Sequence, residues 1–214
     1  MTKKEIVAEI LKREMATPAY RESRDAFDCA NASIISDLRA NGIMVNRLDE
    51  LQASHALMKS AIPVLAKWVP QTEDRKEMLV RMLSVPAARG RIGDVFFEEF
   101  DTIADSESQL KWAIGNALSI TSTASDVPKL LAIAAAKQNG KSRQMVVLGL
   151  KRFNLPEVRK LLIELLNDDD VVAHAASALG NLRAVEAVPQ LTSLLSDSRT
   201  LVRHNAKEAL KKIK

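Results

Sequence analysis

A nine-residue pattern that occurs twice near the C-terminus constrains the fold of this chain more than any other feature. Residues 171–179 and 202–210 share valine at the first position, alanine at the fifth and eighth, and leucine at the ninth, at a separation of 31 residues. A repeat of this length is typical of stacked helical hairpins, each of which buries its apolar side against the next. Because such an array has no single central core, all 214 residues can belong to one array. We therefore expect an all-α solenoid.

The first helix of the expected hairpin can be followed upstream from this repeat. Each copy ends in a leucine, and the residue before the leucine is small in every copy but the first. The leucines, spaced by 35, 32, 29 and 31 residues, are Leu83, Leu118, Leu150, Leu179 and Leu210. We expect the small residues to let the two helices of a hairpin approach closely, while the leucines fill the layer between hairpins.

Prolines predict where the second helix of each hairpin begins. The pattern apolar-Pro-x-apolar recurs at Pro63, Pro128, Pro156 and Pro189. Proline is favoured in the first turn of a helix because its missing N–H would have no partner there and its φ is already helical. These prolines therefore predict helix starts rather than breaks.

The first 60 residues lack the repeat patterns but still have the apolar spacing of amphipathic helices. Three helices are expected, over residues 3–15, about 26–38 and about 47–61. Asn41-Gly42 is expected to end the second of them as a glycine cap. Arrays need end units with a polar outer side. We therefore assign residues 1–60 to a divergent N-terminal helical cap, continuous with a repeat array over residues 61–214 that ends in a single capping helix.

Two longer motifs carry a resemblance to a known family. Residues 168–182 read DDDVVAHAASALGNL and residues 187–197 read AVPQLTSLLSD. Together they resemble the short HEAT-like repeat found in phycobilisome lyases and related bacterial proteins, most strongly over residues 140–214. The resemblance implies a right-handed superhelix in which the second helix of each hairpin lines a concave face. It does not imply one activity, because such repeats occur in chromophore lyases, protein adaptors and alkyl-purine DNA glycosylases.

Composition places the chain in the cytoplasm. The net charge is +4, and Lys141 to Lys214 holds 13 basic and 8 acidic residues, whereas residues 1–139 hold 18 and 19. This mildly basic C-terminal third suits an acidic partner or solvated helix faces. The single Cys29 excludes an internal disulfide and is expected to be a buried thiol. No N-terminal signal peptide or membrane-spanning apolar run is evident, so we expect a soluble cytoplasmic protein without membrane contact.

Several residues are candidates for binding a partner. Four basic residues near the opening prolines lie on helices that are expected to line the concave face, and they are Lys67, Lys129, Arg159 and Lys160. On that face they could bind either a protein partner or phosphate groups along a groove. Arg89 and Arg91 form a glycine-containing basic loop that suits an anion or a partner. Trp68 and Trp112 are candidate aromatic anchors, although the spacing of the aromatic residues also fits burial in the core.

One basic residue recurs at the same position of the first helix. The column consists of Lys76, Lys111, Arg143 and Arg203, with Val172 in the remaining copy. Acidic residues in the adjoining turns, which would pair with the column in a structural ladder, are Asp74, Asp105, Asp169 and Asp197. Alternatively, the column faces a ligand.

Catalysis has little support in the sequence. The chain has no H-E-x-x-H, C-x-x-C or G-x-S-x-G motif, so we predict no metal, no cofactor and no catalytic residue. Sites assembled in space leave no local motif, so a glycosylase-like or bilin-lyase-like use of Trp68 or Trp112 with Asp105 or Asp126 remains an alternative. The leading hypothesis is a non-catalytic interaction module or adaptor that binds a protein on its concave face. Nucleic-acid binding is the alternative, and the oligomeric state is left open.

Overall fold

The regular elements of the structure are helices. The computed structural model describes Glu5, Met15, residues 17–104 and residues 108–213, and it contains no strand in these ranges. The helix predicted over residues 3–15 lies almost wholly outside the described residues, as does Asp105. The chain divides into two compact units, Met1–Val64 and Leu65–Lys214, and the division falls inside α5 (His55–Trp68). The predicted all-α fold is confirmed.

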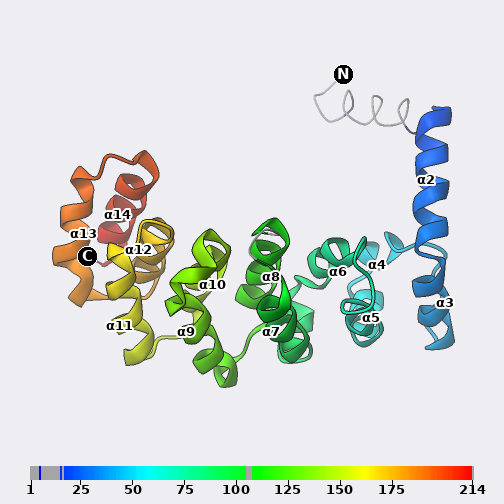
Figure 1. The fold of residues 1–214 in the computed structure, drawn as a ribbon, viewed down its shortest axis with the longest axis horizontal. Coiled ribbons are helices and arrows are strands. Elements are labelled where there is room, and N and C mark those ends of the chain that lie inside the picture. Colours follow the sequence, from blue (N-terminus) through cyan, green and yellow to red (C-terminus); the bar gives the residue numbers. More distant parts are fainter. Residues whose placement is uncertain (1–4, 6–14, 16, 105–107, 214) are drawn as a thin grey trace. The chain divides into compact units, whose positions relative to one another are not determined.

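The first unit contains α2 (Pro18–Ala30), α3 (Ala32–Ala40), α4 (Glu50–Ala53) and the start of α5 (Figure 1). Thr17 caps α2, because its hydroxyl accepts a hydrogen bond from the backbone N–H of Tyr20. Gly42 has a φ of 79° and lets the chain turn back, so that the N–H of Ile43 donates to the carbonyl of Leu38. The predicted glycine cap is therefore confirmed.

Three expectations for the first unit are wrong. The second predicted helix is interrupted between α2 and α3 at Asn31, whose side chain donates to the carbonyl of Phe27. The third is interrupted at Ser54, whose extended backbone separates α4 from α5. Cys29 is exposed, because no residue of α2 is buried. The buried side chains of this unit come instead from α3, α4, the loop between them and the start of α5, and include Ile34, Leu38, Val45, Leu51 and Ile62.

The second unit is an all-α solenoid of helical hairpins. Each first helix is followed by its second helix in the order α6 (Lys76–Leu83), α7 (Gly93–Thr102), α8 (Ser108–Thr121), α9 (Val127–Ala135), α10 (Gln144–Gly149), α11 (Pro156–Glu164), α12 (Val172–Asn181), α13 (Val188–Ser193) and α14 (Thr200–Ile213). Short 3₁₀ turns join them at Pro86–Ala88, Ala124–Asp126, Lys137–Arg143, Leu150–Arg152, Leu165–Asn167, Val185–Ala187 and Leu194–Ser196. The first helices predicted from the leucine spacing are all present.

Small residues bring successive first helices into backbone contact. A Cβ added at Gly149 of α10 would lie 2.6 Å from the Cβ of Ser119 on α8, and one added at Gly180 of α12 would lie 2.5 Å from the Cα of Ala209 on α14. The sequence predicted that small residues bring together the two helices of one hairpin. They instead join first helices of neighbouring hairpins, which form one layer, while α7, α9 and α11 form the other (Figure 1).

The prolines have two different roles. Pro128, Pro156 and Pro189 lie in the first turns of α9, α11 and α13, as predicted. Pro63 lies inside α5, which has already begun at His55, so the prediction of a helix start there is wrong. A 3₁₀ turn or an extended residue precedes each of the three opening prolines, whereas the residues before Pro63 are already helical. The local pattern alone does not distinguish the two cases.

Candidate functional site

The basic column of the first helices is structural. Lys76, Lys111 and Arg143 are 6, 5 and 0% exposed. The guanidinium of Arg143 donates to Asp168 Oδ2 at 2.7 Å, to the Ala134 carbonyl at 2.9 Å and to the Gly140 carbonyl at 3.1 Å. A buried cation held by a carboxylate and two carbonyls has little capacity left for a ligand. Arg143 is therefore engaged by its own chain, whereas Lys111 of the same column lines the groove described below.

The partners of the column differ from those predicted. Lys76 Nζ lies 2.9 Å from Glu99 on α7 and 3.3 Å from Glu73, rather than pairing with Asp74. Burial alone would lower the pKa of Lys76, but the hydrogen bonds to Glu99 and Glu73 outweigh it, so the pKa is raised. Lys111 Nζ lies 5.1 Å from the centroid of the Phe100 ring, and its predicted partner Asp105 lies outside the described residues.

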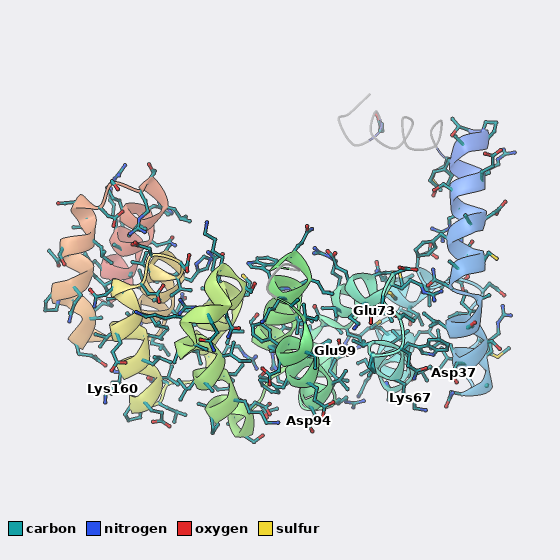
Figure 2. All side chains as sticks on the ribbon, viewed as in Figure 1. Asp37, Lys67, Glu73, Asp94, Glu99 and Lys160 are labelled. Atoms are coloured by element: carbon teal, nitrogen blue, oxygen red, sulfur yellow. The ribbon has the colours of Figure 1, made fainter. Side chains whose placement is uncertain are left out.

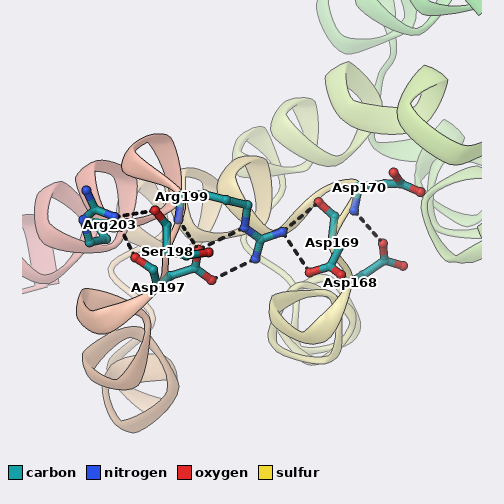
Figure 3. Close-up of polar contacts among 7 residues, drawn as sticks. All are labelled: Asp168, Asp169, Asp170, Asp197, Ser198, Arg199 and Arg203. Carbon is teal, nitrogen blue, oxygen red and sulfur yellow. Dashed lines mark hydrogen bonds and ion pairs between the residues drawn. The ribbon is translucent and has the colours of Figure 1, made fainter.

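At the last turn of the array, Arg199 rather than Arg203 binds the acidic side chains (Figure 3). Its guanidinium donates to both carboxylate oxygens of Asp197 and, at 2.8 Å, to Asp169 Oδ1 of the preceding repeat. The hydrogen bonds from Arg199 lower the pKa of Asp197 to about 2. Arg203 donates instead to the backbone carbonyls of Asp197 and Ser198. At this turn the link between repeats is therefore made by an arginine outside the predicted column.

The second helices leave a groove between α7 and α9 with a volume of about 680 Å³. Its apolar lining consists of Phe97, Ala132, Ile133 and Ala136. Its polar lining consists of Asp94, Glu98, Asp101, Lys111, Lys129, Gln138 and Asn139. An apolar floor with a charged rim is the usual composition of a protein-binding surface.

Lys129, one of the predicted partner-binding residues, lies in this groove and is engaged by its own chain. Its ammonium nitrogen is 2.9 Å from Asp94 Oδ1 and 5.0 Å from the centroid of the Phe97 ring. The hydrogen bond to Asp94 raises the pKa of Lys129. The side chains of both residues remain exposed, at 55% for Lys129 and 86% for Asp94. The pair is therefore open to exchange with solvent or with another charged group.

A second hollow of about 590 Å³ lies at α11 and contains two more of the predicted residues. Its lining consists of Asn154, Pro156, Arg159, Lys160, Ile163, Glu164 and Glu186. Arg159 is held between Asn154 Oδ1, at 2.8 Å, and Glu186 Oε1, at 3.2 Å. Lys160 is exposed. Lys67 of α5, Asp94 of α7 and Lys160 lie toward the same, lower edge of the array in Figure 2.

The basic loop is attached to the end of α8. Arg89 Nε donates to the Ile120 carbonyl at 3.3 Å, and the N–H of Gly90 donates to the Thr121 carbonyl at 2.9 Å. Arg152, which the sequence did not single out, donates to the carbonyls of Ser119, Ile120 and Ser122. Burial and then the charge of Arg89 lower the pKa of Arg152. These arginines cap a helix C-terminus, while Arg91 is exposed.

The two candidate tryptophans lie outside the α7–α9 groove and the α11 hollow. Trp68 and Trp112 are half-buried, and neither lines the two hollows. Phe96, Phe97 and Phe100 are buried in the core. Asp126 accepts hydrogen bonds from the backbone and hydroxyl of Thr123, as a capping residue does.

The described residues include neither a metal-binding cluster nor a membrane-spanning helix. In these ranges no group of three or more His, Cys, Asp and Glu side chains is placed to hold a metal ion. Across the same ranges, no helix combines the length and apolar character needed to span a bilayer.

The acidic side of the α7–α9 groove was not predicted from the sequence. Asp94, Glu98 and Asp101 are spaced at i, i+4 and i+7, which places them on one face of a helix. That spacing can be found in the sequence, but the predicted site contained basic and aromatic residues and no acidic ones. The apolar floor is a different matter, because Phe97 and Ile133 come from separate helices, and only the fold brings them together.

Comparison with known proteins identifies the repeat. Neither the curated proteins nor the solved structures that were compared contain a match to this chain. The family model of HEAT repeats matches residues 127–211, which run from the start of α9 into α14. This match agrees with the hairpins described above and with the resemblance carried by residues 168–182 and 187–197. The C-terminal part of the chain, over residues 127–211, is therefore an array of HEAT repeats.

Proposed function

We propose that this protein is a non-catalytic interaction module that binds a protein partner on its second-helix face, which we define as the exposed sides of α7, α9 and α11. The observation that carries the proposal is the α7–α9 groove, with its apolar floor and its rim of both charges. The hollow at α11 has the same character and belongs to the same layer. In a repeat array, residues of successive units form a continuous strip that suits an extended partner.

The charges on this face favour a protein over a nucleic acid. Lys129 is paired with Asp94 and Arg159 with Glu186, so two of the four cations expected to contact phosphates are already neutralised. Asp94, Glu98 and Asp101 would also repel a phosphate backbone along α7. Of these four cations, Lys67 and Lys160 are left to contact phosphates, whereas strong nucleic-acid binders present a denser basic surface.

Two arginine substitutions on one helix test the proposal. Ala132 is exposed and lines the groove, so Ala132→Arg fills it; Ala135 is also exposed on α9 but does not line the groove, so Ala135→Arg is the matched control. Tagged wild-type protein and both variants are used to capture partners from nuclease-treated host lysate. We expect one or more proteins to be retained by the wild type and by Ala135→Arg and lost with Ala132→Arg, and the purified partner to give the same ranking in direct titration.

A mobility-shift assay tests the nucleic-acid alternative. Binding through phosphates is strongest at low salt, so an interaction of this kind would be visible at about 50 mM salt. We expect no shift of duplex DNA, single-stranded DNA or RNA under this condition. A shift, or proteins that are captured from untreated lysate but not from nuclease-treated lysate, would replace the proposed protein partner with a nucleic acid.

A further inference from the structure

We infer that the α7–α9 groove takes a lysine or arginine side chain from an extended basic segment of the partner, in the place that Lys129 now occupies. This inference rests on the proposed function and names the chemistry of the partner at that site. The chain itself supplies the model for the ligand. The Lys129 ammonium lies over the Phe97 ring at 5.0 Å and against Asp94 at 2.9 Å, so the groove already holds a cation by an aromatic face and a carboxylate.

The charges around this position favour a second cation. Glu98 and Asp101 line the groove, and neither forms an ion pair with any residue that the structure describes. Lys111 also lines it, but this side chain is only 5% exposed and lies over the Phe100 ring. Once Lys129 leaves its position, the accessible rim therefore carries three carboxylates of α7, those of Asp94, Glu98 and Asp101.

Lys129 is suited to being displaced. An ion pair between exposed side chains contributes little to stability, because water and salt screen it and because two flexible side chains must be held still. Arginine from a partner would bind better than Lys129 does, since its planar guanidinium can donate two parallel hydrogen bonds to Asp94 while stacking on Phe97. Release of Lys129 breaks its contacts with Phe97 and Asp94, and the incoming cation makes both contacts in its place.

The spacing of the carboxylates matches an extended segment. Asp94 and Glu98 are four residues apart on α7, which corresponds to about 6 Å along the helix axis. Alternate side chains of an extended chain are separated by about 6.6 Å on one side of that chain. A segment with basic residues at every second position therefore places one cation on Phe97 and Asp94 and the next beside Glu98, with Asp101 further along the same face.

The test uses a fluorescent nine-residue peptide in which arginine alternates with threonine, and a control peptide with citrulline in place of every arginine. Citrulline keeps the shape of arginine without its charge. Binding is followed by fluorescence anisotropy at low and moderate salt. We expect the wild-type protein to bind the arginine peptide, to bind it more weakly as salt increases, and to bind the citrulline peptide at least about tenfold more weakly.

Two variants give opposite results if the inference is correct. Lys129→Met removes the competing cation but keeps the aliphatic side chain, so it should tighten binding of the arginine peptide by about three- to tenfold. Asp94→Asn should weaken binding by a similar factor, about three- to tenfold. Glu77→Gln on α6 and Glu208→Gln on α14 are the matched controls, because they remove carboxylates of first helices that do not line the α7–α9 groove, and they should leave binding unchanged.

The inference is overturned if Lys129→Met leaves binding unchanged or weakens it, because Lys129 would then not compete with the ligand or would itself contact it. Equal binding of the citrulline peptide would overturn it as well. These failures are distinguishable from failure of the proposed function. If Ala132→Arg still loses the captured partner, the second-helix face binds a protein of different chemistry; if it retains every partner, the proposed function itself is wrong. Circular dichroism spectra of all variants establish that they are folded.

Discussion

Arg143 has the largest of the fully buried side chains, and its ion pair with Asp168 joins neighbouring repeats. Asp168 is itself nearly buried, with its side chain 10% exposed. Replacing one partner of such a pair leaves the other charge uncompensated in the interior, which costs about 3–5 kcal/mol. We therefore expect Asp168→Ala to lower the free energy of unfolding, measured in urea, by about 3 kcal/mol.

The double variant Arg143→Met with Asp168→Ala separates the ion pair from packing. It removes both charges, so its loss of stability should be smaller than the sum of the two single losses. Additive losses would contradict a direct interaction and leave the carbonyl contacts of Arg143 as its main contribution.

The lowered pKa of His174 makes the stability of the protein depend on pH. Burial lowers the pKa of His174, which lies half-buried on α12, and its Nδ1 has no hydrogen-bond partner among the described residues. The unfolded chain therefore takes up a proton at a higher pH than the folded chain does. The stability contributed by neutral His174 is complete above the ordinary pKa of about 6.5 and is lost as the pH falls below that value toward the folded-state pKa.

Urea unfolding at about pH 7.5 and pH 5.5 checks the direction of this effect. We expect wild-type protein to be less stable at the lower pH and His174→Gln to show a smaller difference. His204→Gln, a substitution at an exposed position of α14, should retain the wild-type difference. Identical pH dependence in all three proteins would show that folding does not change the pKa of His174.

The sequence predicts where individual charged residues lie better than it predicts which residues they pair with. The alignment of Lys76, Lys111, Arg143 and Arg203 correctly placed a basic residue on α6, α8 and α14 and one directly before α10, and it offered a structural ladder as one interpretation. The partners were predicted from the nearest turn, whereas Lys76 pairs with Glu99, which is 23 residues away on another helix. Local spacing does not determine which carboxylate a long side chain reaches, because that depends on how helices pack.

Glycines in the first helices determine how closely neighbouring helices can pack. In a helix interior alanine is ordinarily favoured over glycine by about 1 kcal/mol. At Gly180 the added Cβ would lie 2.5 Å from the Cα of Ala209, so α12 and α14 would have to separate. Overpacking of this kind costs about 1–3 kcal/mol, so Gly180→Ala should lower the thermal midpoint rather than raise it.

A compensating change and a neutral site control this prediction. Ala209→Gly removes the Cβ that also faces Gly180, at 2.7 Å, and should restore part of the stability lost by Gly180→Ala. Gly93→Ala on α7 would make only ordinary contacts, at 3.8 Å, so it should be neutral or stabilising. A thermal midpoint for Gly180→Ala at or above that of the wild type would argue against close contact of the two helices.

Helices were predictable from the sequence, while the contacts between them were only partly so. The leucine spacing located each first helix, because a helix that packs on one side must repeat its apolar residues with the helical period. The local pattern at Pro63 gave the wrong helix start, since it is compatible with a helix interior as well. The α7–α9 groove could not be predicted from the sequence, because its floor is formed by side chains from two helices that are separate in the sequence.

In a repeat array each unit contacts only its neighbours, so damage at one end should remain local. Val202 of α14 is 3% exposed and packs with Val172 and Ala173 of α12. Its sequence neighbour Leu201 is 58% exposed. Val202→Asp therefore buries a charge, which the packed end of the array cannot accommodate, whereas Leu201→Asp places the same group in water.

Hydrogen exchange measured by mass spectrometry tests how far the damage spreads. For Val202→Asp we expect amides of α12 and α14 to exchange more than about tenfold faster, corresponding to a loss of about 1.4 kcal/mol or more in local opening free energy. Amides of α8 should keep their wild-type rates, because α8 packs chiefly against α6, α7 and α10. Leu201→Asp should match the wild type throughout. Faster exchange over the whole of α6 to α14 would instead mean that the second unit unfolds as one cooperative body, and binding at the α7–α9 groove would then depend on an intact C-terminal repeat.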